Sequence, residues 1–305
     1  MRADLFQNDI ATDKMDAERS PARFASDFAQ LVKARLTLLV LMTTAVGYYL
    51  AAPNPVNYLG LVRAVFGTSL AAAGAAALNQ WWERRSDALM HRTKLRPIPA
   101  GRMRAFDAFA VGFALAVIGV AYLAVVCNSL SALLAAMTIV LYIFAYTPLK
   151  KISAVNTLVG AIPGAIPPLI GWTAARGKLD AGGWSLFAIL FFWQMPHFFS
   201  LAWMYRTDYA RAGFQMIASD DETGARSASQ SVLFCLLLLI VASIPGYLGI
   251  SNIFYVLMSL ILGGLFMAFA MHFHKHKTVR SARWLFLASI TYLPLLLLAM
   301  VVTKL

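Results

Sequence analysis

The chain is 305 residues long, and 60% of its residues are apolar while only 13% are charged. Soluble domains carry about 25% charged residues, so this composition excludes a soluble globular domain and indicates a polytopic membrane protein. The net charge of +12 is compatible with a nucleic-acid-binding protein, but the basic residues lie between apolar segments and leave no soluble domain to read bases. We therefore expect contact with the lipid bilayer and no nucleic acid.

The first 30 residues are polar and predict a flexible cytoplasmic tail, because they lack the apolar core of a signal peptide. Nine apolar segments follow, each near the length of about 20 residues that a helix needs to cross a bilayer. They lie near 31–52, 57–82, 105–126, 129–147, 154–174, 182–205, 228–248, 252–273 and 283–302. The prediction is an all-α fold, with one transmembrane domain of nine helices spanning 31–305.

The basic residues predict how these helices are oriented. Of 26 Lys and Arg residues, six lie at or before Arg35 and sixteen lie in the loops 83–104, 148–153, 206–227 and 274–283. The positive-inside rule places these segments in the cytoplasm. We expect a bacterial inner membrane, since no organellar targeting signal stands out, with the C-terminus in the periplasm. The two longest loops predict an active site on the cytoplasmic side.

The second apolar segment ends in a row of oxygen ligands, Asn79, Glu83 and Asp87. On a helix, the spacing i, i+4, i+8 keeps the three side chains on roughly one face. Carboxylates and carboxamides are hard donors that suit Mg²⁺, which commonly bridges to substrate phosphates. Arg92 and Arg96 follow and could bind those phosphates. The alternative is a polar helix end that only forms salt bridges with neighbouring arginines.

Two further polar groups follow apolar segments. Lys150 and Lys151 follow the fourth segment. They could bind phosphate, or they could only anchor the helix end at the membrane face. The sixth segment contains Pro196, which can break or kink a helix, and His197 next to it. At the end of this segment stand Tyr205, Arg206 and Asp208. Ionisable groups at membrane depth are costly unless they face a cavity or a partner, so we expect one site shared with the acidic row.

Three motifs in this order resemble those of the UbiA-type intramembrane prenyltransferases. They are Asn79-x-x-x-Glu83-x-x-x-Asp87, Tyr146-Thr147-Pro148-Leu149-Lys150 and Trp193-Gln194-Met195-Pro196-His197-Phe198. The last is similar to the subfamily of protohaem IX farnesyltransferases, or haem O synthases. The resemblance runs from about 30 to 300, and it implies a helical bundle around a central cavity. It also implies transfer of the farnesyl group of farnesyl diphosphate to a vinyl group of haem b, with addition of water, giving haem O and diphosphate.

The resemblance assigns roles to the residues that match its motifs. We expect catalytic roles for Asn79, Glu83, Asp87, His197 and Asp208, and magnesium ligation by these residues other than His197. Diphosphate contacts are expected from Arg92, Arg96, Lys150, Lys151 and Arg206. Contacts with the prenyl chain or haem are expected from Tyr146, Trp81, Phe198, Trp203 and Tyr205. The implied cofactor is Mg²⁺, and haem A synthase is the implied functional neighbour.

The chain departs from the family in its second acidic cluster, which is reduced to Asp208. Asp220, Asp221 and Glu222 lie deeper in that loop and are expected to be solvated. For His197 we expect ligation of the haem iron, orientation of water, or a hydrogen bond inside the bundle. The alternatives for the whole chain are a quinone-precursor or chlorophyllide acceptor, and a cation-coupled transporter.

Overall fold

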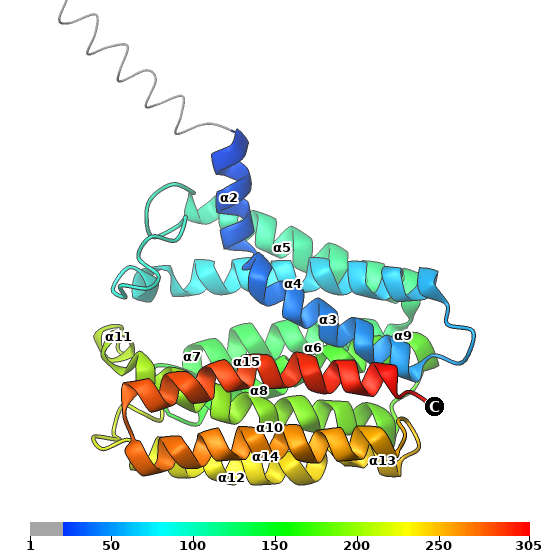
Figure 1. Ribbon diagram of the computed structural model, residues 1–305. Helices are drawn as coiled ribbons and strands as arrows, with labels where there is room; N and C mark the ends of the chain where they lie inside the picture. Colours follow the sequence, from blue (N-terminus) through cyan, green and yellow to red (C-terminus); the bar gives the residue numbers. More distant parts are fainter. Residues whose placement is uncertain (1–20) are drawn as a thin grey trace, which may run out of the picture.

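The computed structural model describes residues 21–305, and this part of the chain is a helical bundle (Figure 1). The helices of its first half are α2 Pro21–Leu31, α3 Ala34–Ala51, α4 Tyr58–Asp87, α5 Ala105–Tyr122, η1 Leu123–Cys127, α6 Ser129–Val140, η2 Leu141–Tyr146, α7 Thr147–Leu149, α8 Asn156–Ala165 and α9 Pro167–Arg176. Those of its second half are α10 Ala181–Met204, α11 Arg206–Arg211, α12 Ala225–Val241, α13 Ile244–Tyr247, α14 Ile253–His276 and α15 Val279–Val302. The segments η1 and η2 are short π-helical turns that continue α5 and α6.

Nine helices in the described part are long and apolar enough to cross a membrane, which confirms the predicted all-α polytopic fold. Asn128 separates the third helix from the fourth, because its side chain accepts a hydrogen bond from the Ser131 amide and caps α6. Helix α4 continues to Asp87, five residues beyond the predicted end at 82. The whole acidic row therefore stands on one continuous helix.

The predicted N-terminal tail is described only in part, because residues 1–20 lie outside the described residues. Its last residues form α2, which projects away from the bundle (Figure 1). Asp27 on α2 accepts hydrogen bonds from Arg102 at 2.8 and 3.0 Å. Lys33, in the left-handed conformation with φ 49°, separates α2 from α3. This turn directs the Lys33 side chain into the bundle, where it contacts α4.

The fifth membrane segment is interrupted at Ile166, between α8 and α9. Helix α9 packs directly against α3, since a Cβ atom on Gly47 would collide with the Pro168 backbone and one on Gly171 with the Thr44 carbonyl. Only glycine permits so close an approach of two helices. The fifth membrane segment is therefore held tightly against α3.

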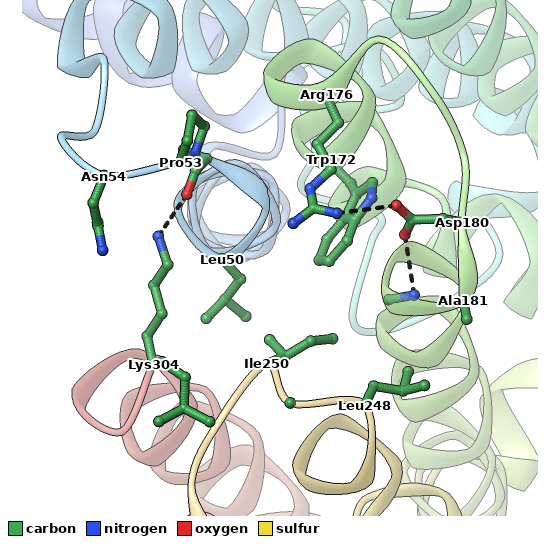
Figure 2. A pocket seen from close by; sticks show the side chains of 14 residues that line it. Leu50, Pro53, Asn54, Trp172, Arg176, Asp180, Ala181, Leu248, Ile250 and Lys304 are labelled. Carbon is green, nitrogen blue, oxygen red and sulfur yellow. Dashed lines mark hydrogen bonds and ion pairs between the residues drawn. The ribbon is translucent and has the colours of Figure 1, made fainter.

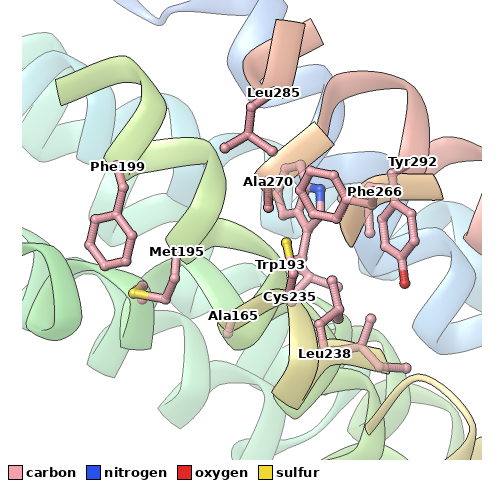
Figure 3. Packing of buried hydrophobic residues seen from close by; sticks show 14 of the residues in the cluster. Ala165, Trp193, Met195, Phe199, Cys235, Leu238, Phe266, Ala270, Leu285 and Tyr292 are labelled. Carbon is pink, nitrogen blue, oxygen red and sulfur yellow. The ribbon is translucent and has the colours of Figure 1, made fainter. Parts of the chain in front are cut away.

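Helix α10 lies at the centre of the second half and packs against α12 and α15 (Figure 1). Its buried side chains Trp193, Met195 and Phe199 belong to a large apolar cluster that includes Cys235 and Phe266 (Figure 3). The helix runs without interruption from Ala181 to Met204. Pro196 therefore does not break it, although a break was one of the two effects considered from the sequence.

The two ends of the bundle differ. The loop 88–104 and α11 lie together at one end, which we call the loop end, and the C-terminus lies at the other (Figure 1). At the C-terminal end is a cavity of about 370 Å³ between α3, α9 and α10 (Figure 2). Arg176 and Lys304 line it and donate to the last carbonyls of α3, Ala51 O at 2.9 Å and Ala52 O at 2.7 Å. These two cations therefore cap a helix at the end away from the acidic row.

Candidate active site at the loop end of α4

The acidic row is buried inside the bundle. Asn79, Glu83 and Asp87 are 0%, 7% and 1% exposed. Each of the three accepts a hydrogen bond from a cationic side chain of a different segment. Charges buried this deeply must be paired to be tolerated. The site is therefore a row of oxygen ligands opposed by a row of cations.

Lys150 is the partner of Glu83, with Nζ 2.6 Å from Oε1. Its ammonium group also lies 4.4 Å from the centre of the Tyr146 ring and 5.6 Å from that of Phe214. Burial by itself lowers the pKa of Lys150, but the charge of Glu83 outweighs burial and the pKa is raised above its usual value. Lys150 is therefore held as a cation beside the acidic row.

Arg96 is the partner of Asp87, with Nη1 2.7 Å from Oδ2. The loop that carries it is folded back onto the end of α4, because the Thr93 hydroxyl donates to the Asp87 carbonyl at 2.8 Å. The arginine predicted to bind phosphate thus lies beside the last carboxylate of the row.

Lys33 is the partner of Asn79, a role that we did not predict from the sequence. Its Nζ donates to Asn79 Oδ1 at 2.6 Å and lies 3.4 Å from the Tyr142 hydroxyl. The Asn79 amide in turn donates to Thr147 Oγ1 at 3.1 Å. Burial lowers the pKa of Lys33 to about 7, and the charge of Arg96 acts in the same direction. A negative charge brought close to Lys33 would raise this pKa again and favour the ammonium form.

We expect Lys33→Met to weaken binding of a diphosphate substrate. One charge-assisted hydrogen bond is lost, which corresponds to a rise in KM of about tenfold or more. Steady-state kinetics with varied prenyl diphosphate measure this rise. Arg35→Met is the matched control, since Arg35 is exposed two residues further on. Equal KM values for the two variants would exclude Lys33 from the site.

The two long loops meet above this row, through Asp208. Its carboxylate accepts from the Arg92 backbone amide at 3.4 Å and from Arg211 Nη1 at 3.0 Å. The Arg92 guanidinium group lies 5.6 Å from the centre of the Tyr205 ring. The two loops therefore contact each other at Asp208, whose carboxylate is turned towards arginine partners, and the shared site stays a prediction.

The buried side chain of Asn156 joins the second long loop to the turn that carries Lys150. The backbone amide of Gln215 donates to the backbone carbonyl of Lys150 at 2.6 Å. The Asn156 side chain is fully buried and donates to the Gln215 carbonyl at 2.6 Å and to the Ser153 carbonyl at 2.7 Å. These bonds hold Phe214 next to the Lys150 ammonium group. We did not predict a role for Asn156 from the sequence, because an asparagine at the start of a helix commonly serves only as its N-cap.

We expect Asn156→Ala to raise the KM for a prenyl diphosphate about tenfold, because loss of the side-chain hydrogen bond to the Gln215 carbonyl frees the loop. Asn128→Ala is the control: Asn128 also donates to a backbone carbonyl, Thr173 O at 2.8 Å, but on the far side of the bundle. Both variants should lose thermal stability, and only Asn156→Ala should change KM. A change of KM in both would mean that stability alone is responsible.

His197 forms a second polar position on α10. Its Nδ1 lies 2.8 Å from the Ser289 hydroxyl of α15, and its ring stacks with those of Trp193 and Phe286. The Phe198 ring stands edge-on to it, 5.5 Å between centres. Among the described residues, no hydrogen bond joins His197 to Asn79, Glu83 or Asp87. The site therefore has two separate parts.

The structure places several predicted residues outside the acidic row. Trp81 packs against Phe109 of α5, 4.8 Å between ring centres. Trp203 is buried in the core, and Arg206 lies over its ring and donates to its carbonyl. Lys151 is exposed to solvent, unlike Lys150 beside it. Trp81, Trp203 and Arg206 therefore contribute to packing, and Lys151 lies on the surface.

One expectation about the second loop is wrong. Asp221 was predicted to be solvated, but it is only 6% exposed and accepts from the Ser227 and Arg226 amides at 2.7 and 3.3 Å. It thereby caps the start of α12, where a carboxylate is favoured by the helix dipole. Its neighbours Asp220 and Glu222 are exposed as expected.

The oxygen ligands fit a magnesium ion only if a substrate completes its coordination. Within residues 21–305, no group of three or more His, Cys, Asp or Glu side chains is close enough to share a metal ion, so Asp208 does not complete a cluster with Glu83 and Asp87. Mg²⁺ commonly binds through one or two carboxylates, waters and substrate phosphates. Glu83 and Asp87, with Asn79 as a neutral donor, match that requirement.

Comparisons with known proteins agree with this geometry. The model of the UbiA prenyltransferase family matches residues 40–293. The chain is 44% identical to the protoheme IX farnesyltransferase of Solibacter usitatus, over 88% of this chain and 96% of that protein. It is 40% identical to the human mitochondrial protoheme IX farnesyltransferase, over 90% of this chain and 62% of that protein. The similarity therefore extends through all three motifs.

Solved structures share the fold. A digeranylgeranylglyceryl phosphate synthase superposes with a TM-score of 0.77 at 16% identity, over 92% of this chain and 98% of that one. A UbiA homologue from Archaeoglobus fulgidus bound to GPP and Mg²⁺ superposes with a TM-score of 0.65 at 13% identity, over 90% and 99% of the two chains. The described part of the chain therefore has the fold of these structures, and the family-model match together with the 44% identity to a protoheme IX farnesyltransferase shows that the chain belongs to the UbiA prenyltransferase family.

Proposed function

We propose that the chain is a haem O synthase. It transfers the farnesyl group of farnesyl diphosphate to a vinyl group of haem b, adds water, and releases haem O and diphosphate. The observation that carries this proposal is the buried row of Asn79, Glu83 and Asp87, each opposed by a cation. The 44% identity to a protoheme IX farnesyltransferase supports the choice of haem as the acceptor.

The first half of the reaction breaks the bond between the farnesyl carbon and the diphosphate oxygen. Negative charge gathers on the leaving group, so positive groups fixed around it lower the barrier. Lys33, Lys150 and Arg96 stand in that position and need only turn from the acidic row to the diphosphate. Arg92, exposed at the edge of the site, adds a further guanidinium donor.

Magnesium held by Asn79, Glu83 and Asp87 would supply further neutralisation of the diphosphate charge. With magnesium at these oxygens, Lys33, Lys150 and Arg96 would no longer be needed to pair them and could donate to phosphate oxygens. Magnesium is thus expected to be required for turnover.

The second half of the reaction joins the farnesyl cation to the electron-rich vinyl carbon of haem. The positive charge then moves to the carbon next to the porphyrin and is captured by water. We assign His197 to this part, since it is partly exposed, lies on α10 apart from the acidic row, and is surrounded by aromatic rings. Aromatic faces such as those of Trp193 and Phe286 also shelter cations.

We further propose that the loop end faces the cytoplasm of a bacterial cell and that the chain lies in its inner membrane, because the loops there carry most lysine and arginine residues. The product would then be available on that side to a haem A synthase.

The test is a reaction with purified protein, haem b, farnesyl diphosphate and Mg²⁺. We expect haem O, identified by mass, and no product when Mg²⁺ is chelated. Parallel reactions with a quinone precursor or chlorophyllide examine the other acceptors. Product with one of these and none with haem b would refute the proposal. Ion flux in proteoliposomes without release of diphosphate would instead support a transporter.

A further inference from the structure

Ser289 on α15 is held by two residues that lie one turn apart on α10. Trp193 Nε1 donates to the Ser289 carbonyl at 2.8 Å, and the Ser289 hydroxyl lies 2.8 Å from His197 Nδ1. The imidazole ring stacks with two aromatic rings, whose centres lie 5.4 Å (Trp193) and 4.8 Å (Phe286) from its own. Ser289 itself is fully buried. The orientation of His197 is therefore restrained by two stacked aromatic rings and by the contact at Nδ1.

The hydrogen bonds of Ser289 determine which nitrogen of His197 carries the proton. The hydroxyl has one proton, and it donates this proton to the Phe286 carbonyl at 2.6 Å, since a carbonyl can only accept. With that proton engaged, we assign the contact with His197 as Nδ1–H donating to the hydroxyl oxygen. In a neutral imidazole this leaves the lone pair on Nε2. Nε2 has no hydrogen-bond partner among the described residues.

We propose that Ser289 is a positioning residue that keeps the Nε2 lone pair of His197 available to the water that captures the porphyrin-side cation. This inference rests on the proposed haem O synthase reaction. The water oxygen bonds to the cationic carbon, one O–H bond breaks, and its electron pair stays on oxygen. The proton passes to Nε2, and the resulting imidazolium is stabilised by its Nδ1–H bond to Ser289. His197 later releases the proton to solvent.

The competing fate of the cation provides a specific readout. Without a base placed at the water, the cation loses a proton from the neighbouring carbon and gives a farnesylated alkene, one water lighter than haem O. A residue that only supports the fold lowers the total amount of product but does not change this ratio. The ratio of alkene to haem O therefore reports on the placement of His197.

The experiment compares the product ratio by mass spectrometry for four proteins. These are the wild type, Ser289→Ala, Ser289→Thr and His197→Ala. We expect the alkene fraction to rise at least about tenfold in Ser289→Ala and His197→Ala, the range of a lost general base. Ser289→Thr retains the hydroxyl and should restore a wild-type ratio. The KM for farnesyl diphosphate should stay within about twofold in all four, since the acidic row is untouched.

Ser259→Ala is the matched control, because Ser259 is also fully buried and donates to a carbonyl three residues earlier, Val256 O at 2.8 Å, but lies on α14 away from His197. Its product ratio should equal that of the wild type. The double variant Ser289→Ala/His197→Ala should have the ratio of His197→Ala alone, as expected of a residue that acts through another.

The outcomes separate this inference from the proposed function. If the wild type gives no farnesylated haem at all, the proposed function fails. If the wild type gives haem O and Ser289→Ala gives the same ratio, the positioning role is wrong. A change of the haem absorption spectrum on binding to the wild type but not to His197→Ala would show that Nε2 binds iron and would also overturn it.

Discussion

Replacing Asp87 by asparagine is expected to lower turnover by about 10²- to 10³-fold, the range found when one stabilising group is removed from a preorganised site. Asp87 is only 1% exposed and is the last oxygen ligand of the row on α4. Asparagine keeps the shape of the side chain but removes the charge that holds Arg96 and that would hold magnesium. The rate of haem O formation under saturating substrate measures the effect.

The control for this variant is Asp107→Asn. Asp107 also accepts from an arginine, Arg104 at 2.8 Å, but that pair is exposed at the start of α5. Exposed pairs contribute about 0–1 kcal/mol, so neither turnover nor stability should change. Near-normal activity of Asp87→Asn, with wild-type amounts of protein in the membrane, would contradict the assignment of the acidic row.

Replacing Lys150 by methionine is expected to impair both folding and binding. Glu83 would be left as a buried charge without its partner, which costs about 3–5 kcal/mol. The substrate would lose the ammonium group that lies between the Tyr146 and Phe214 rings. We therefore expect a lower melting temperature and a KM for farnesyl diphosphate raised at least about tenfold.

Two further variants separate these effects. Lys151→Met changes the adjacent, exposed lysine and should leave both stability and KM unchanged. The double variant Lys150→Met/Glu83→Gln leaves no unpaired buried charge, so it should recover stability. It should not recover activity, because an oxygen ligand has also lost its charge. Recovery of activity would mean that Lys150 serves only the fold.

Much of the architecture could be predicted from the sequence. The nine spans follow from apolar length alone, since a bilayer fixes the length of a helix that crosses it. The acidic row was predictable because its spacing matches the helical repeat. What could not be predicted is where α4 ends: the extension to Asp87 depends on contacts of Arg96 and Thr93 in the following loop.

The partners of the row were harder to predict, because they come from distant segments. Lys33 reaches Asn79 across 46 positions, and Lys150 reaches Glu83 across 67. Nothing local distinguishes Lys33 from other lysines at a membrane face, and only the resemblance of the Tyr146–Lys150 motif distinguishes Lys150 from Lys151. Likewise, Asp221 has the composition of a solvated loop, and its burial follows from the fold around the start of α12.

The haem pigments of bacterial membranes test the central claim most directly. A host that lacks its own haem O synthase is grown with and without this chain, and the extracted haems are separated and weighed by mass spectrometry. We expect haem O only when the chain is present, and only haem b when it carries Asp87→Asn. Membranes that contain the folded wild-type chain and show haem b alone would contradict the account.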